Sequence, residues 1–282
     1  MAATPASVSA DRLSRKGVAA PVRGRITAAG RGLLSLVGIC LFVGFWELCA
    51  RAFDVQNFIL PPASDVFRTL YEARGQLGEQ IPRTITEAGL GFAFGSGAAF
   101  TTAVLVQRSK LFELTVLPFT VVLQSVPIVA ITPVIALIVG RNLKTAIIIV
   151  AIVSFFPVLV NSIRGLLAVS DEELELLHVA AARRGQELWL LRFPTAIPFM
   201  FGGLRVSAAL AVPAALVAEW TAGNSGLGFY ISTKWVAYEI NLVWAGIVLT
   251  TLLTVATFLA VVVVERLLLA RLNAGDERMS TL

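Results

Sequence analysis

The sequence has very few of the residues on which catalytic and metal-binding sites depend. Its 282 residues include one histidine, His178, and two cysteines, Cys40 and Cys49. Because no group of cysteine and histidine residues occurs, we expect no metal site on this chain. No G-x-S-x-G pattern accompanies the histidine, so a serine hydrolase is not indicated either. The phosphate-binding string G-x-x-x-x-G-K-[ST] is also missing, and we expect no ATP to bind through a P-loop.

Charged residues are scarce as well. They make up 15% of the chain, against 57% hydrophobic residues, whereas a soluble domain has about 25% charged residues. The mean hydropathy is +0.81. This composition predicts an all-α polytopic membrane protein, whose length leaves room for roughly six spans of about 20 residues. The net charge of +5 fits arginines on the cytoplasmic side of a membrane and does not require a nucleic-acid partner.

Apolar runs and basic flanks define the expected organisation. We predict a disordered basic cytoplasmic tail over 1–31, a membrane domain over 32–265 and a cytoplasmic tail over 266–282. Arginines favour the cytoplasmic side of a membrane. We therefore expect both tails on that side, which gives the orientation N-in and C-in. The six expected spans are the apolar runs near 32–53, 84–106, 114–139, 145–163, 199–220 and 242–264.

Two of these runs have local features that bear on packing. In the second run Gly91, Gly95 and Ala99 form a stripe of small residues, which predicts close approach of another helix. The third run contains three prolines, including Pro127 and Pro133. We therefore expect irregular backbone over 124–133, which a membrane protein tolerates where neighbouring protein or a water-filled path satisfies the freed backbone groups.

The loop over 165–198 is too polar to span a membrane. Ser170 followed by Glu173 is a capping-box pattern and predicts a helix over 171–184. Gly185 is expected to end that helix in the left-handed conformation. A second short helix over 186–193 should end at Pro194. Two interpretations remain open: the loop folds onto the base of its own protein, or it docks into a groove of a partner.

Several strings carry a resemblance to a known family. Ala180–Gly185, followed by Leu191–Pro194, resembles the E-A-A-x-x-x-G…I-x-L-P loop of the inner-membrane permeases of bacterial ABC importers. Within that group the chain is most similar to permeases for nitrate, sulfonate and taurine. The strings supporting this, in their order over about 40–265, are Leu60–Ser64, Val126–Ala130, Phe155–Pro157, Gly203–Val206 and Ser225–Gly228.

The sequence departs from the family pattern at two positions of this loop. Val179 stands where the family has the acidic residue of E-A-A, and Phe193 replaces the usual leucine before Pro194. An ion pair from Val179 to an ATPase is therefore not available.

The resemblance implies a type I ABC importer permease in the bacterial cytoplasmic (inner) membrane. It implies three protein partners besides membrane lipids: a separate ABC ATPase subunit, an extracytoplasmic solute-binding protein and a second permease copy forming a homodimer. ATP and Mg would bind to the ATPase, so this chain would hold no cofactor and would not be an enzyme. The implied solute is a small organic or inorganic anion of the sulfonate, taurine or nitrate class. Related permeases carry vitamin precursors, thiamine pyrimidines or riboflavin, and this alternative stays open.

The resemblance also assigns candidate residues by position. Coupling to the ATPase falls to Ala180, Ala181, Gly185, Trp189, Phe193 and Pro194. The translocation path would be lined by Gln124, Ser125, Pro127, Thr132, Pro133 and Arg205. The outer gate and the contact with the binding protein are expected at Glu219, Gly226, Gly228, Phe229 and Tyr230. Glu219 could instead hold backbone groups of the loop that follows it.

A function of a different class also has to be weighed. A proton-coupled secondary transporter could use Glu47, Glu87 or Glu219 as proton carriers. Such transporters usually show internal repeats and binding sites near the middle of the membrane. The sequence shows no convincing repeat, and the three acids lie toward the ends of the expected spans. The ATP-driven importer is therefore the favoured interpretation.

Overall fold

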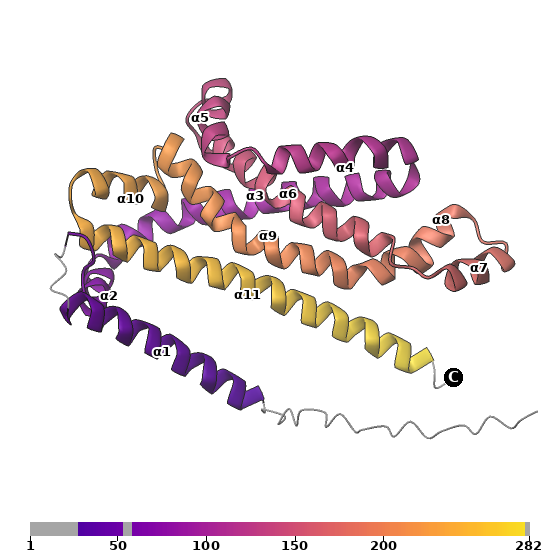
Figure 1. Ribbon diagram of the computed structural model, residues 1–282, viewed down its shortest axis with the longest axis horizontal. Helices are drawn as coiled ribbons and strands as arrows, with labels where there is room; N and C mark the ends of the chain where they lie inside the picture. Colours follow the sequence, from indigo (N-terminus) through magenta and orange to yellow (C-terminus); the bar gives the residue numbers. More distant parts are fainter. Residues whose placement is uncertain (1–27, 53–57, 280–282) are drawn as a thin grey trace, which may run out of the picture. The chain divides into compact units, whose positions relative to one another are not determined.

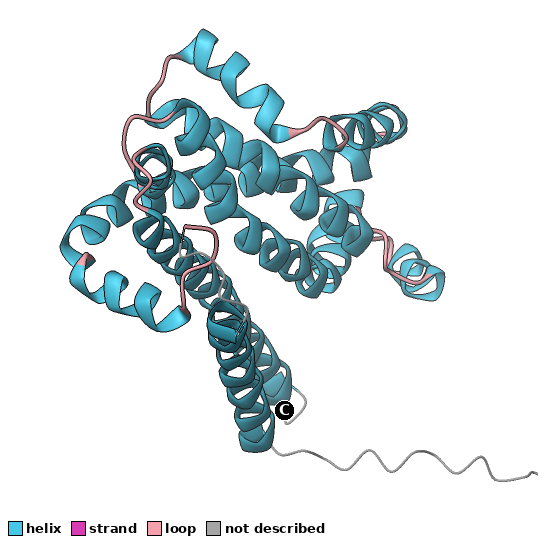
Figure 2. Cartoon of the chain, turned by 60° about the vertical axis from the view of Figure 1, so that its left-hand side comes forward, coloured by secondary structure: helices cyan, strands magenta, loops and turns pink. Residues whose placement is uncertain are grey.

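The computed structural model describes residues 28–52 and 58–279 of the chain, and these residues form helices joined by loops and contain no strand (Figure 2). The chain divides into two compact units, Met1–Phe45 and Trp46–Leu282. In the first unit the structure describes only the beginning of α1 (Ala28–Ala52). Most of the predicted basic tail over 1–31 lies outside the described residues.

Four helices in the described part of the chain are long and apolar enough to cross a membrane. They are α3 (Arg74–Arg108), α6 (Leu143–Leu166), the helix Gly185–Ala222 that contains α9 (Phe193–Ala222), and the Ile240–Ala270 portion of α11 (Ile240–Met279). These match the second, fourth, fifth and sixth predicted spans. The first predicted span coincides with α1, and the third is divided between α4 (Lys110–Gln124) and α5 (Ile128–Val139).

Small residues bring α3, α6 and α9 into close contact. A Cβ atom added at Gly95 would overlap the Ala151 carbonyl oxygen, and one at Gly91 would overlap the Val150 side chain. At the α6–α9 interface the Ser207 hydroxyl donates to the Ser154 carbonyl oxygen over 3.1 Å. The predicted close approach of a second helix at the glycine stripe is therefore confirmed, and its partner is α6.

The irregular backbone in the third apolar run is shorter than predicted. It comprises only 125–127, between α4 and α5, instead of 124–133. Pro127 is the N-cap of α5, where the hydrogen bond that a proline cannot make is not needed. Pro133 lies inside α5 without ending it.

The predicted helix over 171–184 is correct at its start and wrong at its end. Ser170 and Glu173 form the capping box, but α7 (Asp171–Val179) stops five residues early. The left-handed residue is Ala181, with φ 53°, and Ala182 N donates to the Leu177 carbonyl oxygen over 3.0 Å. Such a bond typically closes a helix around one left-handed residue. Gly185 is helical within α8 (Arg184–Glu187), so its predicted left-handed conformation is wrong.

The expected helix end at Pro194 is also wrong. The chain passes from α8 through a π-helical turn, η1 (Leu188–Arg192), directly into α9. Phe193 N donates to the Leu188 carbonyl oxygen, five residues earlier. The wider turn changes the hydrogen-bond pattern just before Pro194. Because Pro194 then stands at the start of α9, its missing N–H leaves the helix intact.

The second unit has two ends that matter for function. One end carries α7, α8 and η1, and the other carries α10 (Leu227–Val236), with α9 running from one to the other (Figure 1). We refer to them as the α7 end and the α10 end. At the α10 end α2 (Ala63–Glu72) packs on α11. There Glu47 accepts a hydrogen bond from Ser64 N over 3.0 Å, which satisfies an N–H group at the start of α2.

Candidate functional site

The α7 end exposes apolar side chains that its own protein does not cover. Val179 is 86% exposed, Trp189 63% and Leu190 67%. Leu188 beside them is buried, and Phe193 packs against the same apolar cluster. Hence this segment is anchored to the base of its own protein and at the same time keeps an apolar face free. Of the predicted coupling residues, the exposed ones are Ala180, Ala181, Gly185, Trp189 and Pro194, and Phe193 is half-buried.

An arginine that the sequence analysis missed fixes this segment. Arg192 Nε lies 2.6 Å from Glu187 Oε1, and its Nη1 donates to the Leu166 carbonyl oxygen over 2.9 Å. The last turn of α6 is thereby tied to η1. The pair spans five residues, a spacing that a π-helical turn brings to one face and an α-helix does not. A search of the sequence for ion pairs at α-helical spacing therefore does not find the pair of Glu187 and Arg192.

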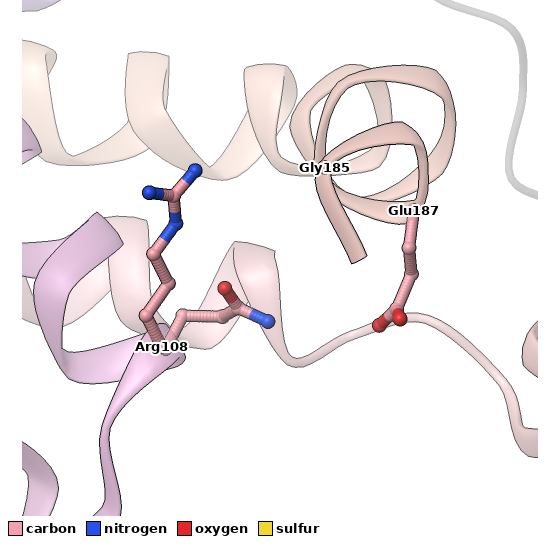
Figure 3. A pocket seen from close by; sticks show the side chains of 4 residues that line it. Arg108, Gly185 and Glu187 are labelled. Carbon is pink, nitrogen blue, oxygen red and sulfur yellow. The ribbon is translucent and has the colours of Figure 1, made fainter. Parts of the chain in front are cut away.

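A cavity of about 490 Å³ lies beside the same segment. It is lined by Gln107 and Arg108 at the end of α3 and by Gly185 and Glu187 of α8. Figure 3 shows the side chains of Arg108 and Glu187 on opposite sides of this space. No atom lies within 4 Å of where a Gly185 side chain would begin, so the fold itself leaves room at this position.

At the α10 end Glu219 holds the backbone of the following loop. Its Oε2 accepts a hydrogen bond from Gly228 N over 2.6 Å, and its Oε1 accepts one from the Thr84 hydroxyl over 2.7 Å. Thr84 Oγ1 in turn accepts from Leu227 N over 2.9 Å. We call Thr84, Glu219 and the segment 226–228 the loop clamp.

Gly226 can only be glycine in this clamp. Its φ is +98°, which L-amino acids rarely adopt, and an added Cβ would overlap the Glu219 carboxyl group. Its N–H donates to Gln80 Oε1 over 3.0 Å. Thr84 and Gln80 were not predicted, since their partners lie more than 130 positions away and no local pattern marks them.

The predicted outer-gate residues therefore lie mainly in the interior. Glu219, Gly226, Gly228 and Tyr230 are buried and Phe229 is half-buried. Tyr230 donates its hydroxyl hydrogen to Gln76 Oε1 over 3.2 Å. A direct contact of these buried residues with a binding protein does not fit this arrangement, because they present almost no surface. The exposed aromatic residues nearby are Trp235 and Tyr238.

The predicted path residues are placed unevenly. Pro127 lines a cavity of about 520 Å³ whose walls are mostly aliphatic, and Pro133 lines one of about 280 Å³. Thr132 is fully buried and donates its hydroxyl hydrogen to the Ile128 carbonyl oxygen over 2.8 Å. It does not line a path in this structure. Ser125 is exposed, and the side chain of Gln124 lies outside the described residues.

Arg205 lines a further cavity, of about 460 Å³, between α9 and α11. Its Nε lies 3.4 Å from Glu265 Oε2, and 42% of its side chain stays exposed. The rest of the lining is apolar apart from the glycine: Gly202, Val206, Ala209, Leu210 and Phe258. This cavity is thus an apolar surface with one partly exposed guanidinium group.

The comparison with known families settles the class of protein. Residues 91–270 match the family described as "Binding-protein-dependent transport system inner membrane component". The chain belongs to this family. It is the permease component of an ABC importer and an inner-membrane protein, and the ATPase activity of such importers resides on a separate subunit. Permeases of this family work with that ATPase and with a solute-binding protein.

Several relatives have the same sequence identity to the permease but are named for different solutes. It is 28% identical to the "Riboflavin transport system permease protein RibX" of Chloroflexus aurantiacus, over 82% of this chain and 87% of the relative. It is also 28% identical to the "Formylaminopyrimidine transport permease protein ThiX" of Halalkalibacterium halodurans, over 79% and 90%. The "Putative aliphatic sulfonates transport permease protein SsuC" of Bacillus subtilis is 28% identical, over 84% and 86%.

A solved structure supports the fold of the permease. An inward-facing conformation of the MetNI methionine ABC transporter superposes with a TM-score of 0.59 at 18% identity. The match covers 67% of this chain and 94% of that one. The similarity confirms the type I importer permease fold.

Proposed function

We propose that this permease forms, with a second copy of itself, the membrane path of an ATP-driven importer for a small organic or inorganic anion. The solute is a sulfonate, taurine or nitrate. The α7 end faces the cytoplasm and binds the ATPase, and both tails lie on that side of six spans. ATP and Mg bind to the ATPase, and this chain holds no cofactor. The solute-binding protein docks at the α10 end.

The observation that carries the ATPase assignment is the free apolar face of the α7 end. Val179, Trp189 and Leu190 project from a segment that Leu188 and Arg192 fix to the protein. A helical segment with an apolar face fits a groove on a partner. Leu188 anchors this segment in the apolar core, and Arg192 anchors it to the end of α6. Movement of the ATPase would therefore be transmitted to α6 and α9.

The choice of an anion rests on Arg205. It is the charged residue among those lining the 460 Å³ cavity, and a guanidinium group there would attract sulfonate, nitrate or carboxylate oxygens. A vitamin precursor, thiamine pyrimidine or riboflavin, is the alternative, and it is supported by the equal similarity to RibX and ThiX. Family membership favours either solute over a proton-coupled transporter.

Uptake by the reconstituted importer tests this proposal. The permease, the ATPase and the binding protein are placed in liposomes that contain ATP, and uptake of labelled taurine, nitrate, riboflavin and formylaminopyrimidine is measured. We expect ATP-dependent uptake of an anion, and we expect the other anions to inhibit this uptake competitively. Uptake of riboflavin or the pyrimidine alone would establish the vitamin-precursor alternative, and uptake driven by a proton gradient without ATP would overturn the proposal.

A further inference from the structure

A second buried carboxyl group lies behind the loop clamp. Glu87 on α3 and Glu219 on α9 are each 1% exposed. Thr84, which binds Glu219, lies one helical turn before Glu87, so both side chains leave the same face of α3. Because Thr84 holds Glu219 Oε1 at 2.7 Å, the carboxyl groups of Glu87 and Glu219 lie near each other in the interior. Arg83 pairs with one of them: its Nε lies 2.5 Å from Glu87 Oε1.

The hydrogen-bond donors around the pair are distributed unequally. Both oxygens of Glu219 accept a hydrogen bond, from Thr84 and from Gly228. Glu87 Oε1 accepts from Arg83, whereas Glu87 Oε2 is buried and has no donor among the described residues. Ionised carboxylates are acceptors only, so two of them cannot hydrogen-bond to each other unless one carries a proton.

Other charged groups near the clamp are engaged elsewhere. Arg141, in the turn before α6, donates to the carbonyl oxygens of Ala222 and Gly223 over 3.3 and 3.4 Å. Lys234 on α10 lies 3.0 Å from Glu239 Oε2. With both acids ionised, the pair and Arg83 would carry one net negative charge in the protein interior, which is strongly unfavourable.

We propose that Glu87 and Glu219 form a proton-binding site, in which Glu87 Oε2 carries one proton and donates it to Glu219. Every oxygen of the pair then has a partner. Arg83, neutral Glu87 and ionised Glu219 carry no net charge together. The ligand is a single proton held between α3 and α9, and it allows Glu219 to accept from Gly228 without repulsion from Glu87.

The site links protonation to the position of α10. Removal of the proton would place two negative charges side by side. Repulsion between them would then displace the Glu219 carboxyl group from its present position and weaken the clamp that holds 226–228 against α3. Loss of the proton would therefore release the clamp.

Matched amide substitutions at the two acids test the site. In Glu87→Gln the amide supplies a permanent N–H donor to Glu219 and keeps an oxygen for Arg83, so it imitates the protonated acid. In Glu219→Gln an amide N–H would face the N–H of Gly228 or the hydroxyl of Thr84, two groups that are donors here. We expect Glu87→Gln to unfold at the temperature of the wild type and Glu219→Gln to unfold at a lower one.

Infrared spectroscopy reads the proton directly. The complete chain in detergent at neutral pH should show the C=O stretching band of a protonated carboxylic acid, shifted in D₂O and absent from Glu87→Gln. Glu265→Gln, which alters a carboxylate paired with Arg205 at 3.4 Å, should keep the band and serves as the control. The measurement needs no solute or ATPase, so its result is independent of the proposed transport function.

Three results would overturn the proposal. One is the absence of that band from the wild type. Another is equal destabilisation by Glu87→Gln and Glu219→Gln, which would mean that both acids are ionised. The third is stabilisation of the wild type by sodium at constant pH, since a metal cation would then neutralise the pair.

Discussion

The Thr84 hydroxyl donates to Glu219 Oε1 over 2.7 Å across 135 residues of sequence. The same oxygen of Thr84 accepts from Leu227 N over 2.9 Å, so one hydroxyl group joins α3, the end of α9 and the start of α10. All three partners are buried. Polar contacts in the interior therefore help to hold the α10 end.

Removing this hydroxyl should loosen the α10 end. Thr84→Val keeps the shape of the side chain but leaves Glu219 Oε1 and Leu227 N without that partner. We expect a loss of stability of about 1–3 kcal/mol for each buried group left unsatisfied. Thermal unfolding of the purified permease measures the loss. Thr84→Ser retains the hydroxyl and should lose clearly less; equal loss in both variants would show that the methyl group matters instead.

The glycine stripe of α3 allows a test with a neighbouring control. A Cβ at Gly95 would overlap the carbonyl oxygen of Ala151, whereas one at Gly97 meets nothing within 4 Å. Gly95→Ala should therefore separate α3 from α6 and destabilise the permease by about 1–3 kcal/mol. Gly97→Ala should raise stability by up to about 1 kcal/mol, because alanine favours helix. If both substitutions had the same sign of effect on unfolding temperature, the α3–α6 contact would be wrong.

Leu188 and Trp189 are adjacent and should have opposite roles. Leu188 is 3% exposed and Trp189 is 63% exposed. Leu188→Ala should destabilise the fold by about 2–5 kcal/mol. Trp189→Ala should leave the unfolding temperature nearly unchanged and weaken binding of the ATPase by about 2 kcal/mol, or about 30-fold. Titration of the ATPase against permease in nanodiscs measures this affinity, and unchanged affinity would remove Trp189 from the docking face.

Features set by neighbouring residues were predictable from the sequence. The capping box of Ser170 and Glu173 depends on two residues one turn apart, and the structure shows it as expected. The stripe of Gly91 and Gly95 depends on helical spacing alone. The long apolar runs likewise predicted the four long membrane helices of the described chain, because a span needs about 20 consecutive apolar residues.

Features that depend on distant partners or on unusual turns were not predictable. Gln80 and Thr84 look like ordinary polar residues until α10 is placed beside them. At the α7 end the preference of left-handed positions for glycine pointed to Gly185, but Ala181 takes that conformation instead. The rule that a helix ends at proline failed at Pro194, because it assumes α-helical hydrogen bonding and η1 precedes that residue.

Substitutions at the end of α7 should change its stability in a direction that the backbone conformation predicts. Ala181 has φ 53°, a conformation that costs a non-glycine residue about 1–2 kcal/mol. Ala181→Gly should therefore stabilise the turn, and hydrogen exchange of the α7 amides should slow. Gly185 is helical, so Gly185→Ala should also stabilise the segment, by about 0.5–1 kcal/mol. Faster exchange in Gly185→Ala would indicate that Gly185, as the sequence first suggested, is the left-handed residue.

Arg205 and Glu265 separate recognition of the solute from stability. Their ion pair is long, at 3.4 Å, and Arg205 is 42% exposed, so losing the pair should cost less than about 1 kcal/mol of stability. Arg205→Gln and Glu265→Gln both remove the pair, but only Arg205→Gln removes the positive charge from the cavity. We expect Arg205→Gln to lower anion uptake by the reconstituted importer about 10-fold or more, in proportion to one lost charge-assisted hydrogen bond of about 1.5–3 kcal/mol. Glu265→Gln should transport at nearly the rate of the wild type, because the guanidinium group remains. If the two variants were impaired equally, the ion pair itself would be required, and Arg205 would act by holding α9 against α11.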